Sequence, residues 1–161
     1  MAEPIHTHRD SIQIAAPPEQ VWELVTAMER YGEWSSENTG GYWRKNEDGV
    51  PGTGQVGDMF VGVNKLGDTE WKAPVEIVER TEQQSFGFVT GGMEYNIALW
   101  QYELEPTADG GTNLTERYEL RTLSPLMKEN GQSEVDYRRD NMIASIRATL
   151  ENMKAAAEGA G

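Results

Sequence analysis

The fold is decided by residues 133–158, which read SEVDYRRDNMIASIRATLENMKAAAE. Apolar side chains recur in this segment every three or four residues, a spacing that places them on one face of an α-helix. The Ser133 hydroxyl can cap the first turn, with Asp136 three residues later. The sequence therefore predicts a long C-terminal helix whose apolar face carries Met142, Ile146, Leu150, Met153 and Ala157.

The chain before this helix predicts a β-sheet. Residues 9–15 alternate polar and apolar side chains, as half-buried strands do. A glycine-rich loop spans residues 46–57, and the later breaks between strands are short. Short links join antiparallel neighbours. We therefore expect an antiparallel sheet of about seven strands, at residues 9–15, 42–45, 58–65, 70–80, 84–90, 95–105 and 113–121.

Two short helices are predicted after the first strand. Pro17 and Pro18 end that strand and open a helix, because proline suits the first helical turn. A second short turn runs from Glu29 to Trp34. Since the first strand precedes this helical pair, we expect it to rejoin the sheet at an edge or beside the last strand. The fold class is therefore α+β, and residues 123–132 form a connector before the long helix.

The length of 161 residues suggests one domain, which we place at residues 9–158 with flexible ends at 1–8 and 159–161. The chain has no cysteine, which rules out disulfides and thiolate metal sites. His6 and His8 are the only histidines and have no evident third ligand, so we expect no metal and no other cofactor. No stretch has the ~20 apolar residues that a membrane span needs. Without a secretory signal, we expect a cytoplasmic protein.

The net charge is −13, and the acidic residues are spread along the chain. A surface this negative repels phosphates, so nucleic acids are poor partners. We expect a monomer or homodimer that binds a small hydrophobic molecule.

The order of elements predicts an internal cavity. The last helix is the only element long enough to cover a sheet of this size. A curved sheet around one helix is not completely filled by a single row of side chains, and the space left over is a pocket. Aromatic residues are concentrated on the strands, and methionines, which adapt to irregular space, lie on the helix. The predicted ligand-binding residues are Trp34, Trp71, Phe86, Phe88, Trp100, Tyr102, Tyr118, Met142 and Ile146.

Several stretches resemble the polyketide cyclase/dehydrase and lipid-transport family of the START-like (SRPBCC) superfamily, which has the helix-grip fold. They are Pro18-Glu-Gln-Val-Trp-Glu-Leu-Val, Glu29-Arg-Tyr-Gly-Glu-Trp-Ser-Ser-Glu, Pro51-Gly-Thr-Gly-Gln-Val-Gly-Asp-Met-Phe, Tyr102-Glu-Leu-Glu-Pro-Thr, Asp109-Gly-Gly-Thr and Leu114-Thr-Glu-Arg-Tyr. The resemblance implies a curved antiparallel sheet wrapped round the C-terminal helix. The family usually has Trp-Ser-Pro-Glu where this chain has Trp34-Ser35-Ser36-Glu37.

In the aromatase/cyclase members of that family, polar groups steer enolisation, aldol closure and loss of water from a polyketide chain. Such chemistry needs a proton acceptor and donors near developing enolate oxygens. Glu37 is the predicted acid/base, because the resemblance places it at the cavity entrance, where an apolar rim would raise its pKa. Strand alternation points Glu116 inward and Arg117 to solvent. The other candidates by residue type are Arg44, Tyr95 and Tyr118.

Three functions stay open at this point. The first is a binding or carrier protein for a small lipid-like or aromatic molecule. The second is a polyketide cyclase or dehydratase. The third is a protein-interaction module like the Hsp90 activator, whose relatives share this fold.

Overall fold

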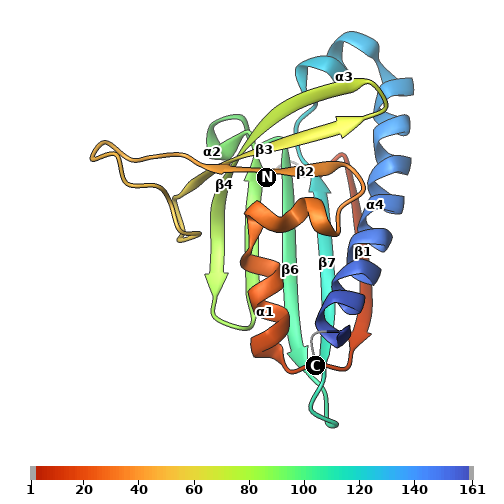
Figure 1. Cartoon of the computed structure of the whole chain (residues 1–161). Helices are drawn as coiled ribbons and strands as arrows, with labels where there is room; N and C mark the ends of the chain where they lie inside the picture. The colour runs from red at the N-terminus through yellow and green to blue at the C-terminus, as the bar shows by residue number, and fades with distance from the viewer. Residues whose placement is uncertain (1–2, 160–161) are drawn as a thin grey trace.

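The computed structural model describes residues 3–159, in which seven strands form one antiparallel sheet in the order β1-β7-β6-β5-β4-β3-β2 (Figure 1). The strands are β1 (His6–Ile14), β2 (Asn38–Trp43), β3 (Met59–Leu66), β4 (Thr69–Thr81), β5 (Ser85–Thr90), β6 (Ala98–Pro106) and β7 (Thr112–Leu120). The helices are α1 (Pro18–Thr26), the 3-10 helix η1 (Met28–Glu33), α2 (Gly92–Tyr95), α3 (Pro125–Asn130) and α4 (Gln132–Gly159). This is the helix-grip architecture expected from the sequence.

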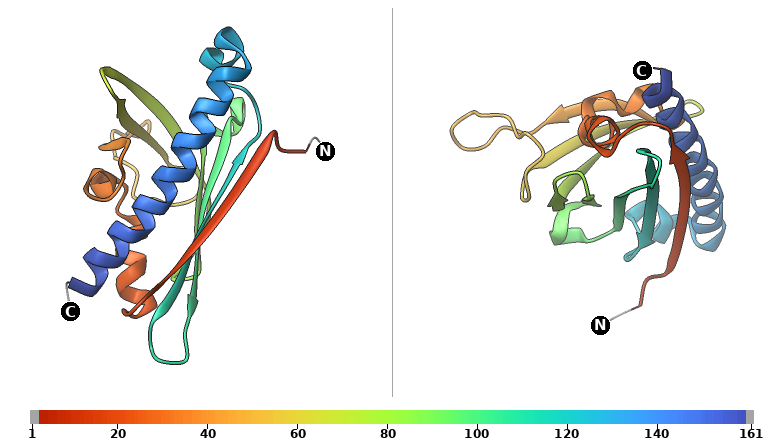
Figure 2. Two further views of the ribbon diagram at one scale, coloured as in Figure 1. Left: turned by 90° about the vertical axis from the view of Figure 1, so that its right-hand side faces the viewer. Right: turned by 90° about the horizontal axis from the view of Figure 1, so that it is seen from below.

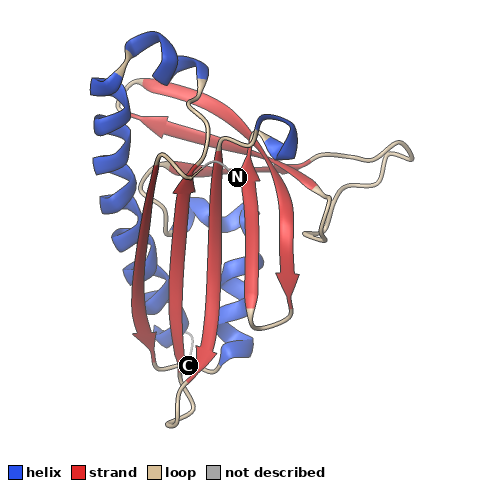
Figure 3. Ribbon diagram, turned by 180° about the vertical axis from the view of Figure 1, so that it is seen from behind, coloured by secondary structure: helices blue, strands red, loops and turns tan. Residues whose placement is uncertain are grey.

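The long helix α4 lies along one face of the sheet, beside α1 and η1 (Figure 2). The view from behind shows the opposite face of the strands with these helices beyond it (Figure 3). All five residues of the predicted apolar face of α4 are buried. The periodicity of residues 133–158 therefore gave both the helix and its buried face correctly, and the helix begins one residue earlier, at Gln132.

Strand β1 is the edge strand beside β7, as its position before the helical pair predicted. It begins at His6 rather than Arg9, so the prediction that residues 6–8 belong to a flexible end is wrong. The reason is pairing: β7 extends to Leu120, which faces His6 across the two strands. His6 and His8 have polar side chains, so the hydropathy pattern does not show that the strand begins at His6. Residues 1–2 and 160–161 of the predicted flexible ends lie outside the described part of the chain.

Contacts between α4 and β1 hold this edge of the sheet against the helix. The Lys154 ammonium donates to the backbone carbonyl of Gln13 at 2.9 Å. The Arg147 guanidinium pairs with Asp10 at 3.2 Å. Exposed ion pairs stabilise little by themselves, but this ion pair and this hydrogen bond both join α4 to the edge strand β1.

Two short helices are absent from the sequence-based expectation. Helix α3 lies within the predicted connector, where Ser124 caps its start and Pro125 is its first residue. A capping serine followed by proline is a helix-start signal, so α3 was predictable. Helix α2 ends at Tyr95 and is flanked by Gly91 and Asn96, both with positive φ. It occupies the start of the predicted strand 95–105, and β6 therefore begins only at Ala98.

Strand β2 runs over residues 38–43 rather than 42–45. Gly40 and Gly41 lie in this strand with φ of +120° and +153°. A side chain at Gly41 would place its Cβ 2.2 Å from the Val61 carbonyl oxygen. Glycine is therefore required for the close approach of β2 to β3.

Candidate functional site

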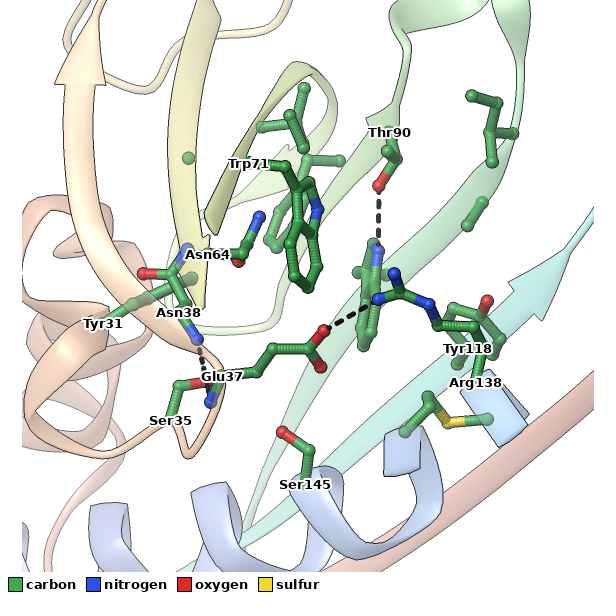
Figure 4. Close-up of a pocket in the computed structure, with 18 of the residues that line it drawn as sticks. Tyr31, Ser35, Glu37, Asn38, Asn64, Trp71, Thr90, Tyr118, Arg138 and Ser145 are labelled. Carbon is green, nitrogen blue, oxygen red and sulfur yellow. Dashed lines mark hydrogen bonds and ion pairs between the residues drawn. The ribbon is translucent and has the colours of Figure 1, made fainter. Parts of the chain in front are cut away.

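A cavity of about 550 Å³ lies between the sheet and α4. Its walls come from β3 to β7, from η1 and the loop that follows it, from α3 and from the inner face of α4. The loop at residues 34–38 and the N-terminal half of α4 meet at one side of it (Figure 4). The curved sheet and the single helix thus leave an internal space, as the element order predicted.

Eight of the nine predicted ligand-binding residues line this cavity: Trp34, Trp71, Phe88, Trp100, Tyr102, Tyr118, Met142 and Ile146. Their side chains arrive from strands and helices that are far apart in the sequence. Whether they contact a ligand stays a prediction.

The ninth residue, Phe86, does not line the cavity. It lies on the same face of β5 as Phe88 but is fully buried in the core. Its ring packs edge-on against Trp22 of α1, with ring centroids 6.1 Å apart. Strand alternation correctly gives the inward face, but it does not show which end of that face α1 covers.

Aromatic contacts fix several of the cavity walls. The Trp100 and Tyr118 rings meet edge to face with centroids 4.5 Å apart. The Trp100 indole nitrogen donates to the Thr90 hydroxyl at 3.0 Å. The Tyr31 hydroxyl donates to the backbone carbonyl of Val25. The Trp100 contacts link β5, β6 and β7, and the Tyr31 bond links η1 to α1.

Glu37 lies on the cavity wall in an ion pair that the sequence did not predict. Its Oε1 is 3.3 Å from Nη1 of Arg138 on α4. The Arg138 guanidinium also pairs with Glu134 at 3.1 Å and lies 4.5 Å from the centre of the Trp71 ring. Figure 4 shows Glu37 and Arg138 facing one another beside Trp71. Arg138 is four residues before Met142 and therefore lies on the same face of α4, one turn nearer its N-terminus. The helical spacing alone could have placed Arg138 on the side of the helix that faces the cavity.

Burial raises the pKa of the Glu37 carboxyl, and the positive charge of Arg138 acts in the opposite direction. The predicted direction of this shift is therefore confirmed. The loop that carries Glu37 is fixed by Ser35, whose hydroxyl oxygen accepts the backbone N–H of Asn38 at 3.0 Å. This serine bond orders the loop even though the family's usual proline is replaced by Ser36.

Glu116 on β7 is the second carboxyl in the cavity wall, and it is only 4% exposed. Burial raises its pKa to about 8, partly offset by the Tyr102 hydroxyl, while the charge of Asp10 raises it further. The group is thus mostly protonated at neutral pH. The inward direction predicted for Glu116 is confirmed.

The remaining candidates lie outside the cavity. Arg117 lies on the outer face of the sheet, where its guanidinium donates to Gln101 at 2.6 Å, as strand alternation predicted. Tyr95 belongs to α2 and is 64% exposed. Arg44 follows β2 and is exposed. Tyr95 and Arg44 were selected by residue type alone, and neither is part of this site.

Within residues 3–159, no group of three or more Asp, Glu or His side chains lies close enough together to hold a metal ion. In the same range, no helix is both long and apolar enough to cross a membrane.

The family described as polyketide cyclase/dehydrase and lipid transport matches residues 6–158. The chain belongs to this family. The match spans every element from β1 to almost the end of α4, so it includes the whole cavity. A comparison with curated proteins finds no match.

Solved structures agree with this assignment. The solution structure of a polyketide cyclase-like protein from Corynebacterium glutamicum is 30% identical, over 96% of this chain and 91% of that chain, with a TM-score of 0.64. A START superfamily protein from Mycobacterium smegmatis is 13% identical, over 97% and 99% of the two chains, with a TM-score of 0.71. The di-domain ARO/CYC StfQ from the steffimycin biosynthetic pathway is 12% identical, over 96% of this chain and 51% of that chain, with a TM-score of 0.72. The last two likenesses are of fold.

Proposed function

We propose that this member of the polyketide cyclase/dehydrase and lipid transport family binds a small hydrophobic molecule in the cavity between the sheet and α4. The observation that carries this proposal is the cavity itself, about 550 Å³ in volume with a mostly aromatic and aliphatic lining. Ligand sites have volumes of about 300–1,000 Å³ and similar walls. An apolar ligand of this size would gain by leaving water for such a space.

Ser145 offers a direct test of this proposal. It lies on α4 and lines the cavity, with its side chain directed toward Glu37 (Figure 4). The indole of a Ser145→Trp variant would occupy space that the ligand needs. We expect this variant to bind the uncharged probe N-phenyl-1-naphthylamine about tenfold more weakly than the unmodified protein, a loss of about 1.4 kcal/mol.

The matched control is Ala144→Trp, because Ala144 is the preceding residue of α4 and is exposed. It adds the same indole on the solvent side and should leave the affinity unchanged. Probe fluorescence measures both affinities, and circular dichroism checks that both variants are folded. Equal affinity in the two variants, or no binding by the unmodified protein, would contradict the proposal.

A second candidate function is a cyclase or dehydratase reaction on a polyketide-type substrate. The observation that favours it is Glu37, a partly buried carboxyl in the cavity wall with a raised pKa and a cation beside it. A general acid/base needs a pKa near the working pH. The di-domain ARO/CYC StfQ, which has this fold, further motivates the candidate.

If this candidate is correct, Glu37→Gln should lower product formation from a linear poly-β-carbonyl thioester by about 100-fold or more. The amide keeps the shape of the side chain but cannot take up the proton. Affinity for the same substrate should change little, which is typical of a group that acts in the transition state. Full turnover by the Gln variant would exclude Glu37 as the acid/base.

A further inference from the structure

Strand β1 is an edge strand, so one side of its backbone faces away from the other strands. In an antiparallel sheet, the N–H and C=O groups of alternate residues point to opposite sides of a strand. The Leu104 N–H donates to the carbonyl of Gln84, which directly precedes β5. Even-numbered residues of β6 therefore bond toward β5 and odd-numbered ones toward β7. Carried through the register of β7, this alternation leaves the odd-numbered residues of β1 at the free edge: Thr7, Arg9, Ser11 and Gln13.

Side chains of α4 bond to backbone groups at the C-terminal end of this edge. The helix runs beside β1 (Figure 2). The Lys154 ammonium donates to the Gln13 carbonyl at 2.9 Å. One residue beyond the strand, the Ala15 N–H donates to the Glu158 carboxylate at 2.9 Å. Lys154 also donates to Glu158, so the two side chains and the two backbone groups form one connected set.

The middle of the edge is occupied in the same way at Ser11. Its N–H donates to the Asp10 carboxylate at 2.9 Å, and its carbonyl accepts from the Arg147 guanidinium at 3.3 Å. Arg147 and Asp10 are themselves paired at 3.2 Å. Both edge-facing backbone groups of Ser11 are therefore bonded to side chains, one of which comes from α4.

Free N–H and C=O groups at a sheet edge are a template on which another strand can pair, and charged side chains are one means by which proteins prevent this. A second copy of the chain presents the same edge. Two β1 strands related by a two-fold axis would run antiparallel, and the groups of each would complement those of the other. Backbone groups already bonded to α4 are not free to pair in this way.

We propose that Arg147, Lys154 and Glu158 block the free edge of β1 and thereby prevent two copies of this chain from pairing through it into one continuous sheet. The inference goes beyond the proposed function, because it concerns an outer edge of the sheet and none of the three residues lines the cavity. If the three side chains only attached α4 to β1, their removal would lower stability without promoting association.

Replacement of all three residues by alanine in the full chain tests the inference. Alanine removes the bonding groups, favours the helix and adds little apolar surface. Sedimentation velocity over a range of protein concentrations should give an association constant at least tenfold higher than that of the unmodified protein. Addition of Arg9→Pro should reverse this increase. The Arg9 N–H faces the free edge, so proline removes a group that a second copy needs and leaves the bonds to β7 in place.

The matched control is the triple variant Arg44→Ala, Lys128→Ala and Glu129→Ala. It removes the same charges at exposed positions outside this edge, and should associate no more strongly than the unmodified protein. Association of the edge variant that is no stronger than that of this control would overturn the inference. So would an increased association that Arg9→Pro does not reverse.

Hydrogen exchange in the unmodified protein gives a second measurement, which applies even where the edge variant does not fold. The Ser11 and Ala15 amides should exchange at least tenfold more slowly, relative to their unstructured rates, than the Arg9 amide. Arg9 faces the same edge in the part of β1 to which the three α4 side chains do not bond. Equal exchange of the three amides would show that the edge is open in solution and would overturn the inference.

Discussion

Replacement of Leu150 by aspartate is expected to unfold the domain. Leu150 is completely buried in the middle of α4, between the sheet-facing residues Ile146 and Met153. An unpaired carboxylate at this position costs several kcal/mol, and a domain of this kind has a total stability of ~5–15 kcal/mol. We expect a loss of about 5 kcal/mol, which leaves little folded protein at 37 °C.

Thermal melting followed by circular dichroism measures this effect. The control is Ala155→Asp, which introduces the same carboxylate at an exposed position of the same helix. Its melting temperature should be close to that of the unmodified protein. A normal melt for Leu150→Asp would mean that this face of α4 does not pack against the sheet.

The second large effect is expected from Glu116→Gln, which should stabilise the protein increasingly as the pH rises. The pKa of Glu116 is about 8 in the folded state, against an ordinary value of 4.5. Between these two values the folded protein holds a proton that the unfolded chain releases. Rising pH therefore favours unfolding of the unmodified protein over this window, and no further loss comes from this group above about pH 8.

Glutamine stays neutral at every pH, so the Gln variant does not lose this part of its folding stability as the pH rises. One pKa unit corresponds to about 1.4 kcal/mol, so its stability relative to the unmodified protein should rise by on the order of 4 kcal/mol from pH 5 to pH 8. The groups that face Glu116, namely Asp10 on β1, Tyr102 on β6 and Tyr31 on η1, are unchanged in the variant. Urea unfolding at several pH values gives the difference, and a difference that does not vary with pH would show that Glu116 is ionised in the folded protein.

Most of the fold followed from periodicity in the sequence. The spacing of apolar residues in 133–158 gave the buried face of α4, and strand alternation placed Glu116 inside and Arg117 outside. Such patterns report which face of one element is buried. These patterns did not predict that β1 begins at His6, because residues 6–8 have polar side chains and are held in the sheet by pairing with β7.

The site was only partly predictable for a related reason. The aromatic residues of the cavity were recognised by type and face, but Phe86 was misplaced because α1 covers its end of β5. The ion pair between Glu37 and Arg138 joins residues 101 positions apart in the sequence. Neither residue shows by itself that the other is near, since that depends on how the loop at residues 34–38 meets α4.

The central claim, that this cavity binds a hydrophobic molecule, is tested most directly by nuclear magnetic resonance of the five tryptophan indole groups. Trp34, Trp71 and Trp100 line the cavity, whereas Trp22 and Trp43 do not. Titration of ¹⁵N-labelled protein with N-phenyl-1-naphthylamine should shift the indole N–H signals of the first three and leave those of Trp22 and Trp43 in place. Shifts confined to Trp22 and Trp43, or no shift in any indole signal at saturating probe, would contradict the claim.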